Sequence, residues 1–261
     1  MILAVAGEMH YMSDNNCYAT VVGGLGNQLF IVAAAYAYAK KTNRKLFIDP
    51  TQWTASQGKY PFEYQRSIFQ NFKYKCSLDV PTIISEQRFN YDELPNPNPN
   101  YSASLHGYFQ SLKYFENYTE DFIKKLSLPE VNTSFIKKKN VAFHIRRGDY
   151  LKFPIHYICN TEYFKDRFRE FAGYQINVFT DSPDIVLKEF ENEEFNLIET
   201  SSELNDLTMM SKHDNIVCSN SSFSWWAALL GKMNKVIVPD KWFLGIDCED
   251  IYLPNMSRIN I

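Results

Sequence analysis

Apolar runs alternate with amphipathic stretches along most of the 261-residue chain, and turn-forming residues separate them. Alternation with a period of two, or a short apolar run, predicts strands at 18–22, 45–49, 141–145, 175–180, 216–218 and 235–238. Spacings of three and four predict helices at 30–41, 63–72, 161–171 and 203–212. A strand that ends at His106 and an aromatic helix that ends near Leu126 are also predicted. This alternation of strand and helix is typical of α/β proteins with parallel sheets.

Two segments interrupt the alternation and suggest how the chain is divided. Prolines at 81, 95, 97 and 99 predict that much of 81–102 is a loop. A polar stretch at 127–140 then precedes the next buried strand, and it predicts a boundary between two α/β domains. We place these domains at 1–138 and 139–261.

Composition excludes several classes of protein. With 27 basic and 30 acidic residues, the net charge of -3 predicts no broad cationic surface and no nucleic-acid partner. The five cysteines are scattered and contain no C-x-x-C pair, which indicates neither a disulfide framework nor a zinc site and favours a reducing compartment. No window approaches the ~18 apolar residues of a membrane span, and the start of the chain lacks a basic secretory signal. We therefore expect a soluble, cytoplasmic protein without a transmembrane segment.

The segment 141–150, V-A-F-H-I-R-R-G-D-Y, carries the strongest chemical signal. Alternation places His144 and Arg146 on one face of the predicted strand and three apolar residues on the other. The R-R-G-D residues at 146–149 follow the carboxyl end of the strand, where open α/β sheets bind their ligands. Guanidinium groups grip phosphate oxygens, and Gly148 allows backbone to approach a ligand closely, so the segment predicts an anion site. The alternative is a surface pair of arginines that forms an ion pair with Asp149.

A glycine-rich loop connects the first strand to the first helix. In V-V-G-G-L-G-N-Q-L-F, the glycines at 23, 24 and 26 allow backbone N–H groups to face a ligand, and Asn27 offers an amide. The loop matches neither the dinucleotide-binding pattern nor the Walker loop. It predicts either a phosphate-friendly site or simply a tight strand-to-helix turn.

A second polar cluster, S-N-S-S-F-S at 219–224, follows the short strand at 216–218. A helix cap needs one of these groups, whereas four hydroxyls and an amide together could hold a phosphate or a ribose. Another polar strand tip occurs at Asp181, after the strand 175–180. Tyr108 and Phe109 follow the strand that ends at His106, and they could flank a sugar or pack in the core.

In combination, these motifs resemble glycosyltransferase family 11, the α-1,2-fucosyltransferases that use GDP-fucose. The blocks are G-G-L-G-N-Q-L-F at 23–30, H-G-Y-F-Q-S at 106–111, H-I-R-R-G-D-Y at 144–150 and S-N-S-S-F-S-W-W-A-A at 219–228. A weaker block, F-T-D-S at 179–182, has Asp181 without the second acid usual in the family. The resemblance implies a GT-B-like fold of two facing Rossmann-like domains, with the acceptor on 1–138 and GDP-fucose on 139–261.

The implied reaction is inverting transfer of L-fucose from GDP-β-L-fucose to the 2-hydroxyl of a galactoside or similar sugar in a glycan. The partners are then a nucleotide sugar and a glycan acceptor. No D-x-D pattern is present, so no metal or other cofactor is expected. The alternatives are a fucosyltransferase of another linkage, α-1,6 or protein O-linked, and a non-catalytic protein that binds nucleotide sugars.

The resemblance also implies roles for individual residues. Arg146 stabilises the departing diphosphate, Asp149 or His144 accepts the proton of the acceptor hydroxyl, and Arg147 supports the loop or the phosphate from outside. His144 could equally be structural, and Asp149 could instead pair with Arg147. The donor-binding residues are Gly24, Gly26, Asn27, Gln28, Arg146, Arg147, Asp181, Ser219, Asn220, Ser221, Ser222 and Phe223. The acceptor-binding residues are His106, Tyr108 and Gln110.

Overall fold

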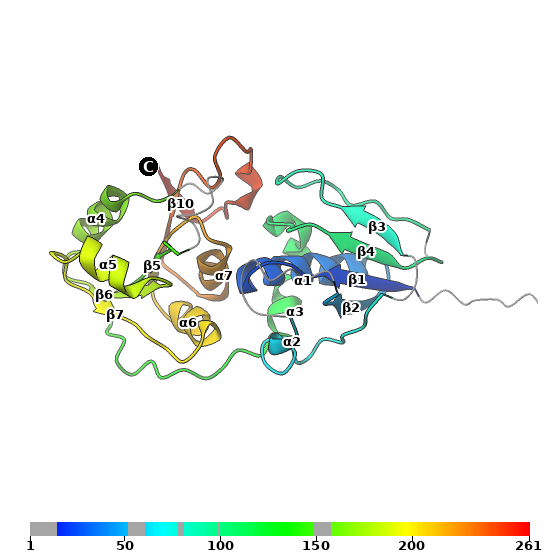
Figure 1. Cartoon of the computed structure of the whole chain (residues 1–261), viewed down its shortest axis with the longest axis horizontal. Helices are drawn as coiled ribbons and strands as arrows, with labels where there is room; N and C mark the ends of the chain where they lie inside the picture. The colour runs from blue at the N-terminus through cyan, green and yellow to red at the C-terminus, as the bar shows by residue number, and fades with distance from the viewer. Residues whose placement is uncertain (1–14, 52–60, 78–80, 99, 149–157) are drawn as a thin grey trace, which may run out of the picture.

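Two parallel β-sheets form the framework of the protein (Figure 1). The structure is a computed structural model that describes residues 15–51, 61–77, 81–98, 100–148 and 158–261. Sheet A has four strands in the order β2-β1-β4-β3, and sheet B has six in the order β10-β9-β8-β5-β6-β7. Every pair of neighbouring strands in both sheets is parallel. The fold is therefore the two-sheet, parallel α/β arrangement predicted from the sequence.

The first half of the chain builds sheet A. Its elements are β1 (Asn16–Thr20), α1 (Leu25–Lys41), β2 (Lys45–Asp49), α2 (Pro61–Tyr64), β3 (Thr82–Ser85), β4 (Ala103–His106), the 3-10 turns η1 (Leu112–Tyr114) and η2 (Glu116–Tyr118), and α3 (Thr119–Ile123).

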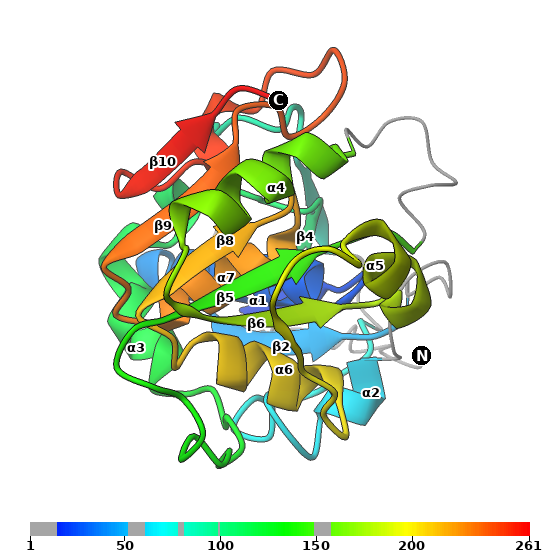
Figure 2. The ribbon, with the colours of Figure 1, turned by 90° about the vertical axis from the view of Figure 1, so that its left-hand side faces the viewer.

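The second half builds sheet B, beginning at Asn140. Its elements are β5 (Asn140–Ile145), α4 (Thr161–Glu170), β6 (Gln175–Thr180), α5 (Pro183–Glu189), β7 (Asn196–Leu197), α6 (Glu203–Met210), β8 (Asn215–Cys218), α7 (Ser222–Leu230), β9 (Lys235–Pro239), η4 (Glu249–Ile251) and β10 (Met256–Ile259). Helices α4 and α5 lie on one face of sheet B, and α6 and α7 lie on the other (Figure 2).

Helix α1 is the central element of the molecule. Apart from Asn27, all its residues from Leu25 to Ala39 are buried, and its alanines allow close packing on every side. The helix begins at Leu25, five residues before the predicted start. A glycine inside the first turn suggested a loop, but Gly26 is needed there because a Cβ would lie 2.6 Å from the backbone of Ser222 and Phe223.

Aromatic side chains fill the contact between α1 and α7. Phe30 of α1 lies 4.3 Å from Trp225 and 5.3 Å from Trp226, measured between ring centroids, and Phe115 stacks on Trp226 at 5.5 Å. Both tryptophans are fully buried. One apolar cluster therefore runs from sheet A through α1 and α7 to the near face of sheet B.

A second, smaller cluster lies on the outer face of sheet B. It contains Val141, Phe143 and Ile145, whereas Ala142 belongs to the first cluster, as strand alternation predicted. Phe143 stacks on Phe168 of α4, with 4.7 Å between ring centroids.

Three predicted elements differ from the structure. Strand β3 lies within the predicted loop 81–102; Pro81 does not prevent it, because proline is tolerated where an edge strand begins. The predicted helix 63–72 is helical only at Pro61–Tyr64 and continues as turns. The aromatic helix after His106 is two 3-10 turns and the short α3, because the chain bends to pack Phe115 and Phe122 against α1 and α7.

Candidate functional site

Arg146 occupies the carboxyl end of β5, the central part of sheet B. Its Nε lies 3.0 Å from Asp181 Oδ2, at the tip of β6, and its backbone N–H donates to Ser219 Oγ over 2.9 Å. The Arg146 side chain is 30% exposed and that of Asp181 is 24% exposed, so both can be reached from solvent. The ends of three neighbouring strands thus position Arg146, whose guanidinium is partly accessible.

Arg147 points the other way and is buried inside the protein. Its Nε and one Nη donate to the two carboxylate oxygens of Glu189 over 2.9 and 2.8 Å, and the other Nη donates to the carbonyl of Cys159 over 3.0 Å. The guanidinium also lies 5.4 Å from the centre of the Phe164 ring. Its partner is Glu189 of α5, a residue that was not predicted from the sequence. A signal was available, because Ser182-Pro183-Asp184 has the cap, the first-turn proline and the acid of a helix start.

Asp181 organises the turn that contains both arginines. Its Oδ1 accepts the backbone N–H of Arg147 over 3.0 Å, while its Oδ2 contacts Arg146. A Cβ at Gly148 would lie only 2.1 Å from Asp181 Oδ2, so any other residue here would displace this carboxylate. The Gly148 N–H in turn donates to Ser182 Oγ over 3.1 Å.

His144 lies on the same face of β5 as Arg146 but is only 4% exposed. Burial, aided by the nearby positive charge of Arg146, lowers the pKa of its imidazole to about 3. The ring is therefore neutral and a weak base, which argues against the role of proton acceptor considered from the sequence. Its buried Nδ1 has no hydrogen-bond partner among the described residues, and the ring lies 5.6 Å from that of Phe223.

The serine-rich segment 219–224 links β8 to α7 and is largely buried. Ser219 donates to the carbonyl of His144 over 2.9 Å, and Asn220 donates to that of Trp242 over 2.7 Å. Ser221 caps α7 by accepting the N–H of Phe223 over 3.3 Å. These residues fix the start of α7 beside the end of β5, and Ser222 and Phe223 remain partly exposed there.

Asn27 joins the two halves of the protein at this point. Its Oδ1 accepts from Ser222 Oγ over 2.7 Å and from Gln110 Nε2 over 2.8 Å. Three of the four sequence blocks therefore meet at one atom, although Asn27 and Ser222 are 195 positions apart. With Oδ1 fixed in this way, the donor group Nδ2 makes no hydrogen bond to any described residue.

The glycine loop leads directly into α1 and is held by a hydrogen bond from that helix. Gly24 occupies the N-cap position of α1, and Gln28 Nε2 donates to the carbonyl of Gly23 over 2.9 Å. Gly23 has a φ of 75°, a left-handed conformation that favours glycine. Gln110 is only 5% exposed, and its buried Oε1 has no partner among the described residues. Gln110 is thus placed beside Asn27 rather than on an open acceptor surface.

The other two predicted acceptor residues lie at the end of β4. His106 Nε2 lies 3.0 Å from Ser104 Oγ, and burial lowers the pKa of this imidazole, although the charge of Asp49 opposes the shift. The N–H groups of Tyr108 and Phe109 donate to the carboxylate of Glu86 over 2.7 and 2.9 Å. Burial raises the pKa of Glu86, and these two hydrogen bonds oppose the shift.

Some expectations cannot be placed in the structure. Asp149, proposed as a base, lies outside the described residues.

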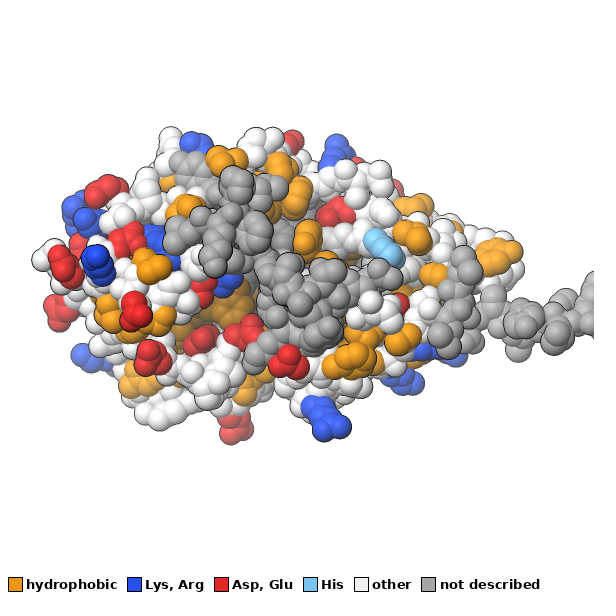
Figure 3. Space-filling model, viewed as in Figure 1, with side chains coloured by type: hydrophobic (Ala, Val, Ile, Leu, Met, Phe, Trp, Pro, Cys, Tyr) orange, Lys and Arg blue, Asp and Glu red, His pale blue; other side chains and the backbone are white. Residues whose placement is uncertain are grey.

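Within the described ranges, no group of three or more His, Cys, Asp or Glu side chains is arranged to hold a metal ion. In the same ranges, no helix has the length and apolarity needed to cross a membrane. All five cysteines are free thiols. Basic and acidic side chains lie interspersed on the face shown in Figure 3.

Comparison with known protein families gives one match that covers most of the chain. The model of glycosyl transferase family 11 matches residues 63–260. This range includes the blocks at 106–111, 144–150 and 219–228, while the glycine loop precedes it.

Two curated relatives come from Escherichia coli. An α-1,2-colitosyltransferase is 27% identical over 266 residues, which cover 86% of this chain and 91% of the relative. The O-antigen biosynthesis glycosyltransferase WbnK is 25% identical over 287 residues, covering 87% of this chain and 95% of WbnK.

A solved structure also shares the fold. It is that of NodZ, an α-1,6-fucosyltransferase co-crystallised with GDP. It superposes with a TM-score of 0.56 and 14% sequence identity, covering 86% of this chain and 94% of NodZ. The arrangement of two facing sheets is thus that of GT-B-like transferases.

Proposed function

Because the chain belongs to glycosyltransferase family 11, we propose that it transfers L-fucose from GDP-β-L-fucose to the 2-hydroxyl of a galactoside or similar sugar in a glycan. The observation that carries this proposal is the position of Arg146 where three strands of sheet B end: Asp181 holds its partly exposed guanidinium, and Ser219 binds its backbone N–H. Fucose as the donor sugar is supported by the NodZ structures with GDP and with GDP-fucose. The α-1,2 linkage is supported by the name of the colitosyltransferase.

Arg146 is the proposed catalytic residue. When the anomeric carbon is attacked, the bond to the GDP oxygen breaks and negative charge develops on the departing diphosphate. A well-placed donor typically stabilises such charge by about 3 kcal/mol in the transition state. The ion pair to Asp181 engages Nε and fixes the plane of the guanidinium, so that its orientation is set before the nucleotide binds.

The start of α7 completes the proposed donor site. A nine-residue helix presents partial positive charge at its N-terminus, where a diphosphate is favoured. The buried Nδ1 of His144, unpartnered among the described residues, lies on the Arg146 side of β5 and would be satisfied by a polar atom of the donor. We assign His144 this binding role, and Asp149 remains the proposed base.

Asn27 is the proposed contact from the first half. Its Oδ1 is fixed by Ser222 and Gln110, so Nδ2 is oriented as a donor for the phosphate or the sugar. The residues His106 and Tyr108, at the carboxyl end of β4, remain proposed for the acceptor.

The test is an assay of GDP release with GDP-fucose and lactose, followed by NMR determination of the linkage in the product. Arg146→Lys should lose about 100-fold or more in kcat, because an ammonium group cannot reproduce the planar contacts of a guanidinium. The matched control is Arg169→Lys, an exposed arginine that pairs with Asp166 on α4 and should retain activity. Equal activity of both variants would refute the assignment of Arg146.

A second donor sugar is favoured by one observation, the 27% identity to a colitosyltransferase. GDP-colitose is therefore compared with GDP-fucose in the same assay, and preference for colitose would replace fucose in the proposal. We further propose that the donor binds without a divalent metal. Calorimetry of GDP binding in EDTA should give the same affinity as without it, and loss of binding would contradict this.

A further inference from the structure

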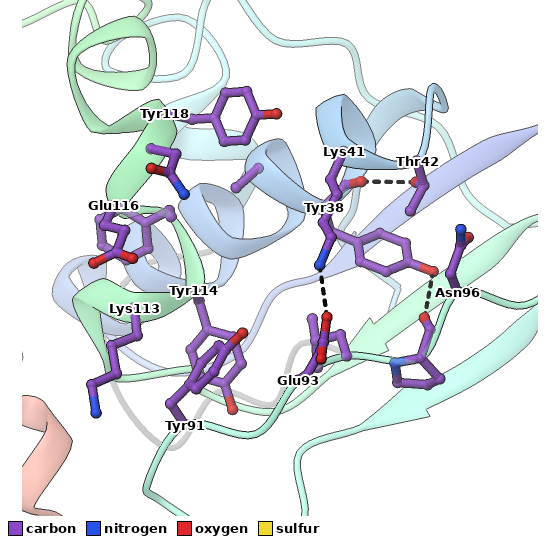
Figure 4. A pocket seen from close by; sticks show the side chains of 15 residues that line it. Tyr38, Lys41, Thr42, Tyr91, Glu93, Asn96, Lys113, Tyr114, Glu116 and Tyr118 are labelled. Carbon is purple, nitrogen blue, oxygen red and sulfur yellow. Dashed lines mark hydrogen bonds and ion pairs between the residues drawn. The ribbon is translucent and has the colours of Figure 1, made fainter.

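A separate cavity of about 800 Å³ lies on the first half of the protein. Its walls are the last turns of α1, the segment 91–96 and the turns at 113–118 (Figure 4). None of the four sequence blocks contributes a lining residue. Asn27 and Tyr38 lie on the same helix, eleven residues apart, which corresponds to about 16 Å along its axis. The cavity is therefore distinct from the Arg146 site.

Four tyrosines and a phenylalanine contribute to the walls of this cavity. Tyr91 and Tyr114 lie side by side, with ring centroids 4.9 Å apart and planes at 61°. Tyr38 forms part of the facing wall, where its hydroxyl donates to the carbonyl of Pro95 over 3.0 Å. The hydroxyls of Tyr91 and Tyr118 make no hydrogen bond to another described residue. The cavity thus combines ring faces with polar groups that a ligand could satisfy.

The charged groups around the cavity are compensated, except for one carboxylate. Lys41 forms an ion pair with Glu93 at 3.0 Å, and Lys113 forms one with Asp250 at 2.6 Å. Glu116 has no ion-pair partner within the described residues, so the unpaired charge is negative. A phosphate would find no unpaired cation among the described lining residues, whereas sugar hydroxyls would find carboxylate and tyrosyl oxygens.

We propose that this cavity binds a neutral oligosaccharide and that it holds the distal sugars of the acceptor glycan. The volume lies within the range of about 300 to 1,000 Å³ usual for small-molecule sites. The C–H face of a pyranose packs on the electron-rich face of an aromatic ring, and its hydroxyls hydrogen-bond around the rim. The binding of sugar rests on the cavity alone; its role toward the acceptor rests on the proposed transferase function.

Binding is tested first, in the absence of any nucleotide sugar. Saturation-transfer NMR with lacto-N-neotetraose measures the affinity of the wild type, Tyr118→Ala and Glu116→Gln. Each variant should bind the tetrasaccharide about 3- to 10-fold more weakly, the effect of one lost stacking or hydrogen-bonding contact. The matched control is Tyr101→Ala, an exposed tyrosine of the same half that does not line the cavity. Absent binding, or equal affinity of all four proteins, would overturn the proposal.

Kinetics then separate the cavity from the transferase reaction. The two cavity variants should raise KM for lacto-N-neotetraose about 3- to 10-fold, while kcat and the KM for lactose stay unchanged. Unchanged kinetics with the tetrasaccharide would refute the acceptor role even if transfer occurs. A wild type that binds the tetrasaccharide through Tyr118 and transfers no sugar would refute only the proposed function. Melting temperatures equal to wild type show that the variants are folded.

Discussion

A methyl group at position 148 tests whether the geometry around Asp181 sets the reactivity of Arg146. In Gly148→Ala, the new Cβ would lie 2.1 Å from Asp181 Oδ2 and 2.9 Å from its Cγ. Since ordinary contacts begin at about 3.4 Å, the carboxylate must retreat by more than 1 Å. The φ of Gly148 is not positive, so the effect comes from this contact and not from backbone strain.

The expected loss follows from what the carboxylate holds. Asp181 lies 3.0 Å from Arg146 Nε and accepts the N–H of Arg147 over 3.0 Å, so its displacement turns the guanidinium away from its present plane. A misplacement of about 1 Å at a reacting group typically lowers the rate about 100-fold, which is about 2.7 kcal/mol of transition-state stabilisation. Stability should change by only about 1 kcal/mol, because the ion pair is partly exposed.

The assay is a double-mutant cycle on kcat for GDP release, with Gly148→Ala, Asp181→Ala and the double variant. If the methyl group acts through the carboxylate, the double variant should be no slower than Asp181→Ala alone, because nothing remains to be displaced. Losses that multiply in the double variant would show that position 148 acts independently of Asp181. Full activity of Gly148→Ala would show that the turn does not control Arg146.

Four further predictions concern stability and the contact between the halves. Arg147→Lys should lower the melting temperature more than it lowers kcat, because one ammonium cannot span Glu189 and a carbonyl; a purely kinetic loss would contradict this. Burial opposes ionisation of Glu189, but hydrogen bonds from Arg147 and Thr161 outweigh burial and lower the pKa of this carboxyl. Ionised Glu189 therefore stabilises the fold fully when the pH is above the ordinary pKa of a glutamate. This stabilisation is lost as the pH falls through the lowered pKa of the folded protein. Urea unfolding of Glu189→Gln between pH 6 and pH 3 should therefore show a weaker pH dependence than wild type, and parallel curves would refute it. Gly26→Ala should lower the melting temperature by about 3 to 10 °C, because the new Cβ would meet backbone atoms at 2.6 Å. Gly24→Ala is the control and should leave the melting temperature unchanged, because there is open space around its Cβ. Equal effects of the two variants would refute the steric explanation. Asn27→Ala should lower kcat more than GDP affinity if it meets the donor only in the reacting complex, and a normal kcat would remove it from the site.

Much of sheet B followed from local sequence pattern. The strand Gln175–Thr180 and the first-half strand Lys45–Asp49 have the predicted bounds, because each has a clear apolar run with a polar end. Alternation along β5 also separates Arg146 from Arg147: the first continues the His144 face and the second continues that of Ile145. Both arginines were predicted as donor residues, since a motif does not show which guanidinium already has an internal partner.

The contacts that depend on distant residues could not be predicted in this way. Glu189 follows Arg147 by 42 positions on a helix that was not predicted, and nothing in the local pattern connects the two. Gln110 was expected at the acceptor because its block lies in the first half, where the resemblance places the acceptor; the sequence did not predict that its amide donates to Asn27. Strand β3 was missed because Pro81 directly precedes a short T-I-I-S segment, and pairing with β4 outweighs the local preference for a loop.

The aromatic packing between α1 and α7 limits how enzymes of this kind can be recombined. Burying a tryptophan removes about 150 to 250 Å² from water, worth about 4 to 6 kcal/mol, and Trp225 and Trp226 are both fully buried in the cluster that includes Phe30. A chimera that takes its first half from one relative and its second from another must therefore match these side chains and keep glycine at position 26. The two halves are not interchangeable modules, and exchange of acceptor specificity is better attempted by transplanting surface loops than by swapping halves.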